Sequence, residues 1–216
     1  MKKYVVIFFK FSILIVITIS PARIRNINSS YVLIEQDITN TENVTADVED
    51  VIRVKLRSQC LSISRAEVKK IVTQKGFFDK YWNNSGVFKN QYESAKIKND
   101  QVVIDHTTGL IWHQSGSKDF LNLEEAKEWI TELNNNGYAG KNTWRLPTLE
   151  EALSLMENKK MNGNLYIDPA FDSWQWCILT GDSLDSNKSW LAAFSGRVDW
   201  FDSNVRINYV RPVCSN

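Results

Sequence analysis

The stretch NTWRLPTLEEALSL, residues 142–155, places a Trp-Arg pair and a proline directly before a predicted helix. Thr148 is the expected N-cap residue, and Glu151 lies at the spacing that completes a capping box. Pro147 cannot continue a preceding hydrogen-bond ladder, so it fixes the direction in which the chain enters the helix. The apolar residues expected to face inward are Leu149, Ala152, Leu153 and Met156. The stretch is therefore typical of a corner that specifies a fold.

The Trp-Arg pair is interpreted as packing and not as a binding site. We expect Trp144 to fill the core beside Trp129 and Leu153. We expect Arg145 to bind a nearby carboxylate or main-chain carbonyl groups. The residues to which we assign structural roles are Trp112, Trp129, Trp144, Arg145, Pro147 and Thr148. The binding site is expected in the loops and strands after Asn158.

The segments around this corner predict an α+β domain. Residues 101–114 are typical of a β-hairpin, because two β-prone runs flank a turn that ends in Gly109. A capping box of Asn122 and Glu125 opens an amphipathic helix with the inward face Ala126, Trp129, Ile130 and Leu133. Residues 158–173 are loop-like. Three late β-prone segments are expected, separated by a connection at 196–202: Trp174 to Thr180, Ser189 to Phe194 and Val205 to Val213.

Residues 53–100 are expected to form a helical extension that docks on the main domain, residues 101–216. Ser64 and Glu67 have the spacing of a capping box, and Gly76 suits the end of the helix. An apolar helix face and the aromatic residues after it are expected to make the contact: Val68, Ile71, Val72, Phe77, Phe78, Tyr81 and Trp82.

Residues 1–22 have the features of a secretory signal: a basic start, the apolar run 11–19 and small residues before a cleavage position after Ala22. An uncleaved anchor is the alternative, because residues 4–19 approach the length of a membrane span. Residues 23–52 read as an acidic, partly disordered tether. We therefore expect an exported protein that is periplasmic, cell-surface or secreted. It would contact a membrane only through an uncleaved N-terminal segment.

Five motifs follow one another in residues 101–216: VIDHTTGLIW, EEAKEWITELNNNGYAGKNTWRLPTLEEALSLME, IDPAF, a Trp followed by Thr-Gly-Asp-Ser, and YVRPV. In this order they resemble the Lcl C-terminal domain family, named for the C-terminal domain of a Legionella collagen-like adhesin. The resemblance implies a C-type-lectin-like fold, related to that of formylglycine-generating enzymes. There the first and last strands pair, two helices flank the sheet, and a long loop region forms the ligand-binding surface. It also implies adhesion, including binding of sulfated glycans.

The segment SGRVDWFDSNVRINYVRP, residues 195–212, combines guanidinium groups with aromatic rings. Guanidinium suits sulfate or carboxylate through paired donors, and aromatic faces suit sugar rings. The ligand-binding candidates are Arg197, Trp200, Asp202, Arg206 and Tyr209. Packing is the alternative for Trp200, because strand alternation places it on the same face as Val198.

Residues 181–187, GDSLDSN, gather oxygen ligands in a predicted loop, so calcium is the one candidate cofactor. The candidate ligands are Asp182, Asp185 and Asn187. The stretch lacks the spacing of an EF-hand, and Asp and Asn also form turns without metal. An ordinary hydrogen-bonded loop is therefore the alternative.

The cysteines and histidines give little support for catalysis. The sequence contains no C-x-x-C, G-x-S-x-G or H-E-x-x-H motif. His106 and His113 lie on the two arms of the predicted hairpin and are interpreted as surface or turn residues. In an oxidising compartment Cys177 and Cys214 could pair, and Cys60 would be a free thiol or pair with another chain.

Together these features predict a non-catalytic, exported binding module whose ligand is a glycan, in one version sulfated, or a protein surface. The alternatives are an envelope-anchored structural or sensory protein and an enzyme on a formylglycine-generating-enzyme-like fold. Nucleic acid is not an expected partner, because cleavage after Ala22 would remove three lysines and take the formal net charge from +1 to −2 (23 minus 25), whereas such binders usually carry a clustered basic surface.

Overall fold

The computed structural model describes residues 3–8, 14–19 and 53–215. The chain divides into two units, Met1–Glu49 and Asp50–Asn216. In the first unit, β1 (Lys3–Phe8) and β2 (Leu14–Ile19) form an antiparallel pair. The predicted cleavage position and the acidic tether lie outside the described residues. No helix in the described ranges is both long and apolar enough to cross a membrane.

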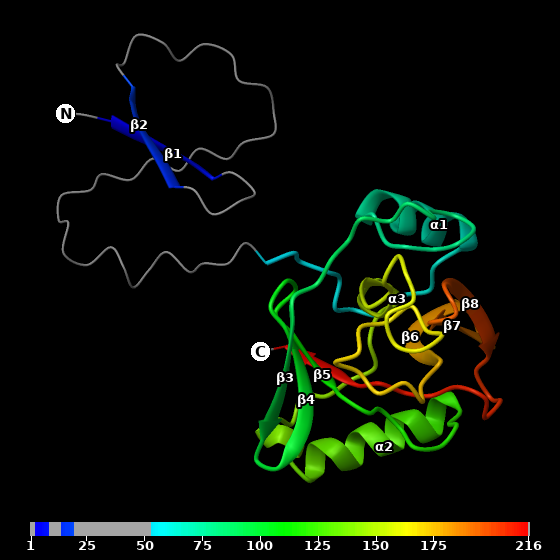
Figure 1. Cartoon of the computed structure of the whole chain (residues 1–216). Helices are drawn as coiled ribbons and strands as arrows, with labels where there is room; N and C mark the ends of the chain where they lie inside the picture. Colours follow the sequence, from blue (N-terminus) through cyan, green and yellow to red (C-terminus); the bar gives the residue numbers. More distant parts are fainter. Residues whose placement is uncertain (1–2, 9–13, 20–52, 216) are drawn as a thin grey trace. The chain divides into compact units, whose positions relative to one another are not determined.

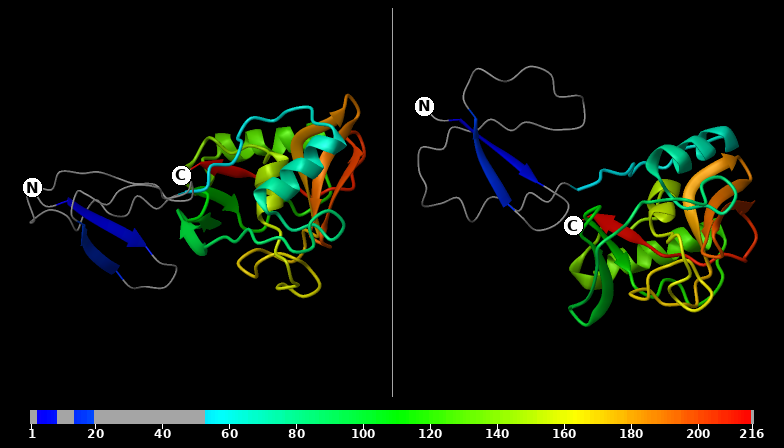
Figure 2. Two further views of the ribbon diagram at one scale, coloured as in Figure 1. Left: turned by 90° about the horizontal axis from the view of Figure 1, so that it is seen from above. Right: turned by 45° about the horizontal axis from the view of Figure 1, so that its top comes forward.

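The second unit is an α+β structure with two antiparallel sheets, as the sequence predicts. The sheets have the strand orders β3-β4-β5-β9 and β6-β7-β8, and they lie at opposite ends of the unit in Figure 1 and in both views of Figure 2. The elements are α1 (Arg65–Lys75), β3 (Tyr92–Ile97), β4 (Asp100–Asp105), β5 (Leu110–His113), α2 (Leu123–Asn135), the 3-10 turn η1 (Tyr138–Gly140), α3 (Leu149–Ser154), β6 (Cys177–Asp185), β7 (Lys188–Ala193), β8 (Arg197–Asp202) and β9 (Val213–Ser215).

The local signals of the sequence are confirmed at the helix starts and at the hairpin. Each of the three α-helices begins with the expected capping box, and Gly76 adopts the left-handed conformation that ends α1. The hairpin of β4 and β5 turns through Gly109, which has a φ of 72°. These features depend on residues only a few positions apart.

The four-stranded sheet separates two hydrophobic cores. Leu110 and Trp112 of β5 face the first core with α1, α3 and the β6-β7-β8 sheet, whereas Ile111 faces the second core with α2. All four residues of β5 are buried, because both faces of this strand are covered. The last strand continues the pattern, since Trp112 pairs with Val213 and Ile111 pairs with Cys214.

The corner at residues 142–155 has the structural role expected of it. Arg145 binds the Glu151 carboxylate through Nη1 and Nη2 at 2.7 and 2.6 Å, and Nη1 also donates to a main-chain carbonyl. Trp144 is buried in the second core, where Trp129 packs against it. Leu153 belongs to the first core, so the expected contact of Trp144 with Leu153 is wrong.

The predicted ends of the late strands are wrong in two places. Residues 197–202, expected as a connection, form β8, and residues 205–213 are irregular up to the start of β9. Residues 181–185, expected in a loop, belong to β6, which continues past a register shift beyond Leu179. Residues 203–212 run between the β6-β7-β8 sheet and α2 (Figure 1). Their main-chain groups form hydrogen bonds with several different segments of the chain, which explains why the stretch is irregular.

The extension ahead of residue 101 is built into the second unit. Val68, Val72, Phe77 and Phe78 belong to the first core, as expected, whereas Tyr81 is 74% exposed. Residues 92–97, which were not predicted as a strand, form β3 at the edge of the four-stranded sheet. The extension therefore supplies both core residues and a strand.

Residues 53–63, here called the strap, are held on the domain by main-chain hydrogen bonds and by one buried carboxylate that makes several contacts. The carboxylate of Asp182, in β6, accepts hydrogen bonds from both Nη atoms of Arg57, at 2.9 and 2.6 Å, and from the amide of Leu61, at 2.6 Å. It also accepts the amide of Leu149, the first residue of α3, at 2.7 Å. The Thr148 hydroxyl completes the connection by donating to the Arg57 carbonyl at 2.8 Å. Asp182 thus joins the strap, α3 and β6.

Replacing Asp182 by alanine is expected to lower the free energy of unfolding by about 3–5 kcal/mol, because the change removes one partner of a buried ion pair. Urea unfolding measures the difference. Asp185→Ala is the matched control, since Asp185 is an exposed carboxylate on the same strand, and its effect should be much smaller. Equal effects of the two changes would contradict the role assigned to Asp182.

Candidate functional site

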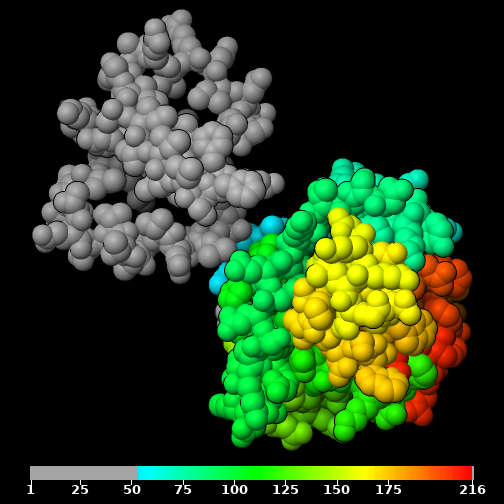
Figure 3. All heavy atoms as spheres, viewed as in Figure 1, coloured from blue at the N-terminus to red at the C-terminus, as the bar shows by residue number. Residues whose placement is uncertain are grey.

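Two exposed tryptophans flank a buried glutamine in residues 173–176, here called the tryptophan turn. Trp174 is 74% exposed and Trp176 is 44% exposed, whereas Gln175 between them is 3% exposed. In Figure 3 the segment around residue 175, coloured amber, lies at the surface below the yellow loop. Exposed apolar side chains that lie together, as opposed to singly, often mark interaction surfaces on a folded domain. The turn is therefore the first candidate for a binding site.

Gln175 anchors the turn through both ends of its side-chain amide. Its Nε2 donates to the Ser117 carbonyl at 2.9 Å, and its Oε1 accepts from Nη2 of Arg211 at 3.1 Å. Both contacts are buried. Because the central residue of the turn is fixed, the two indole rings are displayed from a rigid support.

Arg211 lies at the centre of this support and is fully buried. Its guanidinium donates to the main-chain carbonyls of His113, Gln114 and Asp172 as well as to Gln175. It also lies 4.8 Å from the ring centre of Phe171. Burial lowers the pKa of Arg211 to about 9. Its hydrogen bonds hold the loops on either side of the tryptophan turn in place.

The loop at residues 117–120 adds a third aromatic side chain beside the turn. The Ser117 hydroxyl accepts the amide of Val210 at 3.0 Å and donates to the Asp119 carbonyl at 2.9 Å. Phe120 is 37% exposed and packs on Tyr209 at a centroid distance of 4.6 Å. Tyr209 is itself buried, so its expected role in direct ligand contact is wrong and it supports Phe120 instead.

The other predicted ligand-binding residues lie on and after β8, and their charged groups are occupied. Arg197 binds Asp199 at 2.8 Å, and Arg206 binds Glu125 of α2 at 2.9 Å. Asp202 accepts the amide of Asn204 in the following turn. Trp200 is 39% exposed, and the Lys188 ammonium lies 4.9 Å from its ring centre. The charged groups of these candidates are therefore each already engaged within the fold.

Trp174 and Trp176 are not among the site residues predicted from the sequence. Both were expected in a strand beginning at Trp174, but β6 begins only at Cys177. In a half-buried strand two alternate tryptophans would face the core and the polar residue between them would face solvent. The reverse holds here, because Gln175 has partners on two distant segments. The sequence feature that could have indicated this site is a polar residue between two tryptophans at the end of a long loop.

The predicted calcium ligands do not converge. Asp182 uses both oxygens in the ion pair and amide bonds of the strap, so its assignment as a metal ligand is wrong. Asp185 is exposed and caps the following turn by accepting the amide of Asn187 at 2.9 Å. Within the described part of the chain no cluster of three or more His, Cys, Asp or Glu residues could hold a metal ion.

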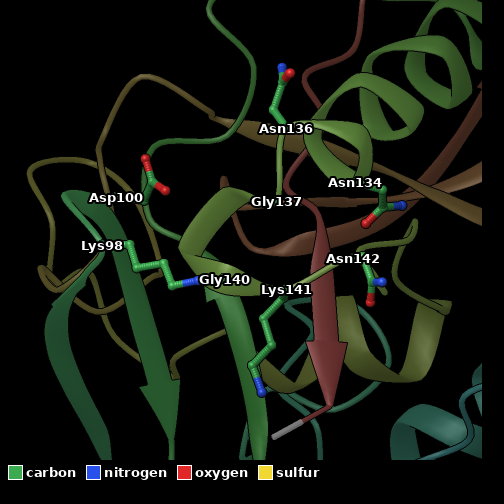
Figure 4. A pocket seen from close by; sticks show the side chains of 8 residues that line it. All are labelled: Lys98, Asp100, Asn134, Asn136, Gly137, Gly140, Lys141 and Asn142. Carbon is green, nitrogen blue, oxygen red and sulfur yellow. The ribbon is translucent and has the colours of Figure 1, made fainter.

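A polar pocket of about 570 Å³ lies at the C-terminal end of α2. In Figure 4 the ammonium group of Lys98, from the β3-β4 turn, points toward Gly140. Two of the lining side chains already form hydrogen bonds within the fold. Asn134 binds the main chain of Trp144 through its side-chain oxygen and nitrogen, and Asp100 accepts a hydrogen bond from the amide of Ala139. The lining residues are Lys98, Asp100, Asn134, Asn136, Gly137, Gly140, Lys141 and Asn142, with no aromatic ring among them. It is the weaker candidate for a sugar site.

The two histidines have different environments. His106 is half-exposed and pairs with Glu93 at 2.8 Å, which agrees with the expected surface position. His113 is buried, so the expected surface position is wrong for it. Its ring stacks on Tyr138 at 4.4 Å, and its Nδ1 accepts the amide of Gly116 at 2.9 Å. His113 therefore helps to hold the loop that leads to Ser117.

The three cysteines do not form the disulfide that the sequence allowed. Cys177 and Cys214 are free and buried, and they lie in different sheets, so the disulfide between them is not formed. Burial raises the pKa of Cys177 to about 12 and that of Cys214 to about 11, which disfavours reactive thiolates. Cys60 is a free, exposed thiol on the strap.

Acid should destabilise the fold through His113. Burial, followed by the neighbouring Arg211 charge, lowers its pKa from 6.5 to about 4, whereas the Asp100 carboxylate opposes this shift. Between these two pH values the unfolded chain binds a proton that the folded chain does not, so the free energy of unfolding falls as the pH falls. The expected loss is about 3 kcal/mol by pH 4. Urea unfolding across this range measures it.

The matched variants for this prediction are His113→Gln and His106→Gln. The first removes the titrating group and should flatten the acid dependence, whereas the second should leave it as in the parent protein. The comparison uses the slope with pH, so an overall loss of stability in His113→Gln does not affect it. A parent-like slope in His113→Gln would contradict the assignment.

Comparison with known proteins places the later part of the chain in a family. A family model described as the Lcl C-terminal domain matches residues 101–214. No curated protein and no solved structure matches the chain. Since the matched residues make up more than half of the 216, the chain belongs to the Lcl C-terminal domain family.

Proposed function

We propose that this protein is a non-catalytic binding module that recognises a glycan through the tryptophan turn. The observation that carries the proposal is the pair of exposed indoles, Trp174 and Trp176, fixed from below by buried Gln175 and Arg211. Aromatic faces pack well against the apolar faces of sugar rings, and tryptophan is enriched in recognition hot spots. A rigid support lowers the ordering cost of binding.

The proposal includes a C-type-lectin-like fold for the second unit. Three features support it: the last strand pairs with the β4-β5 hairpin, α2 covers the four-stranded sheet, and long loops connect α3 to β6. In the implied fold the first and last strands pair. Here β9 pairs with β5, the second arm of the hairpin, and β3 and β4 lie beyond it. The site would then be formed by loops on a rigid base.

A sulfated ligand bound by the arginines of β8 and the following turn is the less favoured version. Arg197 and Arg206 are each paired with a carboxylate at 2.8–2.9 Å, so a sulfate would have to compete with an existing ion pair. Both side chains are about half exposed, which keeps such exchange accessible. A ligand that binds at the tryptophan turn would not have to displace an ion pair.

The proposed role requires no catalytic step. The His113 imidazole is buried and already accepts an amide, and the buried Cys177 and Cys214 thiols have raised pKa values. We further propose export, to the periplasm, the cell surface or the medium. The support for export is the basic and apolar order of residues 1–22.

Alanine at Trp174 or Trp176 should weaken glycan binding at least tenfold, because each removes a stacking surface of hot-spot type. A glycan array containing neutral and sulfated polysaccharides, followed by calorimetric titration of the best ligand, makes the measurement. Trp200→Ala is the matched control, since Trp200 is also exposed but lies on β8. It should bind as the parent does.

The same array separates the alternatives. Loss of binding in Arg197→Ala and Arg206→Ala, with parent-like binding in Trp174→Ala, would move the site to β8 and the turn after it. Absence of any glycan binding would favour a protein partner and overturn the proposal.

A further inference from the structure

Two further surface segments that carry exposed aromatic side chains are linked to the tryptophan turn by hydrogen bonds. On one side, Gln175 joins the turn to the loop that carries Phe120. On the other side, the Trp176 carbonyl accepts a hydrogen bond of 2.8 Å from the amide of Phe194, the first residue of the β7-β8 connection. The Gly196 carbonyl in that connection accepts the amide of Lys80 at 2.9 Å. Hydrogen bonds thus link three surface segments that each carry exposed aromatic rings.

The third segment, residues 79–83, is as firmly held as the other two. Asp79 is buried, accepts the amides of Tyr81 and Trp82 at 2.8 and 2.9 Å, and accepts the amide of Val198 in β8 at 2.8 Å. Tyr81 projects from this support and is 74% exposed. We call Phe120, Trp174, Trp176 and Tyr81 the aromatic row. A buried polar residue, Ser117, Gln175 or Asp79, lies within three positions of each member and binds other segments of the fold.

The charges around the aromatic row largely cancel. Lys118 and Asp119 are exposed neighbours of opposite sign beside Phe120. The Lys80 ammonium is engaged by the Ser195 carbonyl and lies 4.6 Å from the ring centre of Tyr166. Arg197 is paired with Asp199. A ligand that follows this surface therefore meets aromatic rings beside charges of both signs, and the Lys80 and Arg197 cations are already engaged within the fold.

We propose that the aromatic row binds several consecutive rings of one linear, uncharged polysaccharide. This inference rests on the proposed function and names the class of its ligand. A single sugar would occupy only the tryptophan turn, leaving Phe120 and Tyr81 exposed without a role. A chain of sugar rings presents repeated apolar faces that successive aromatic side chains can cover. Uncharged units fit because no free cationic group dominates the surface.

The test compares short and long oligosaccharides of the same chemistry. Cellobiose, cellotetraose and cellohexaose, with the corresponding chitin oligosaccharides as a second series, are titrated calorimetrically against the purified protein. Affinity should rise at least tenfold from the disaccharide to the hexasaccharide, because each added stacked ring contributes about two- to tenfold. Heparin-derived oligosaccharides of equal length, measured at low and high salt, test the preference for uncharged chains.

Variants locate the ends of the bound chain. Phe120→Ala and Tyr81→Ala should each weaken hexasaccharide binding about two- to tenfold and leave disaccharide binding unchanged. Trp174→Ala should weaken both, and Trp200→Ala should weaken neither. Thermal unfolding of each variant confirms that the protein is folded. Since Phe120 packs on Tyr209, Phe120→Leu provides a second variant that keeps apolar contact while removing the ring.

Three results would overturn the inference in distinguishable ways. Equal affinity for disaccharide and hexasaccharide, still dependent on Trp174, would overturn the aromatic row and leave the proposed function standing. Tighter, salt-sensitive binding of heparin oligosaccharides would overturn the preference for uncharged chains. Absence of binding to any oligosaccharide in the set and on the array would overturn both the inference and the proposed function.

Discussion

The fold depends on the buried carboxylate of Asp182. A charge in the interior is costly unless it is paired and hydrogen-bonded, and Asp182 meets this condition through Arg57, the Leu61 amide and the Leu149 amide. Helix α3 has only six residues, too few to be stable alone, so its position depends on such partners. Because Arg57 and Leu61 precede the family match, the strap completes a charge network that residues 101–214 alone would leave open.

A second buried charge performs a similar role for the loops. Irregular segments lack the regular ladders that satisfy main-chain carbonyls, and unsatisfied buried carbonyls are costly. Arg211 donates at once to the carbonyls of His113 and Gln114 at the end of β5, to the Asp172 carbonyl and to the Gln175 side chain. The tryptophan turn is thereby as well fixed as a strand end, although it contains no regular structure. Exposed indoles on such a support lose little conformational freedom when a ligand binds.

What the sequence predicted correctly was local. The capping boxes at Ser64, Asn122 and Thr148 and the hairpin turn at Gly109 depend on residues a few positions apart, and all are present. The partner of Asp182 lies 125 residues away, so no spacing rule could distinguish an ion-pair acceptor from a calcium ligand. Likewise, Gln175 is buried between two exposed tryptophans only because Ser117 and Arg211 bind it, which reverses the alternation expected for a strand.

The motifs of the family specify the residues that hold the fold together more than the residues that bind a ligand. Arg145 in the WRLPT motif, Asp182 in the Thr-Gly-Asp-Ser motif and Arg211 in the YVRPV motif are each engaged in contacts within the fold. None of these three motif residues is therefore free to select a ligand. Specificity must come from side chains that the support leaves exposed, and those can change without disturbing Asp182 or Arg211. A ligand assigned to one relative thus cannot be transferred through these motifs, and under the proposed function Trp174, Trp176, Phe120 and Tyr81 would decide what this chain binds.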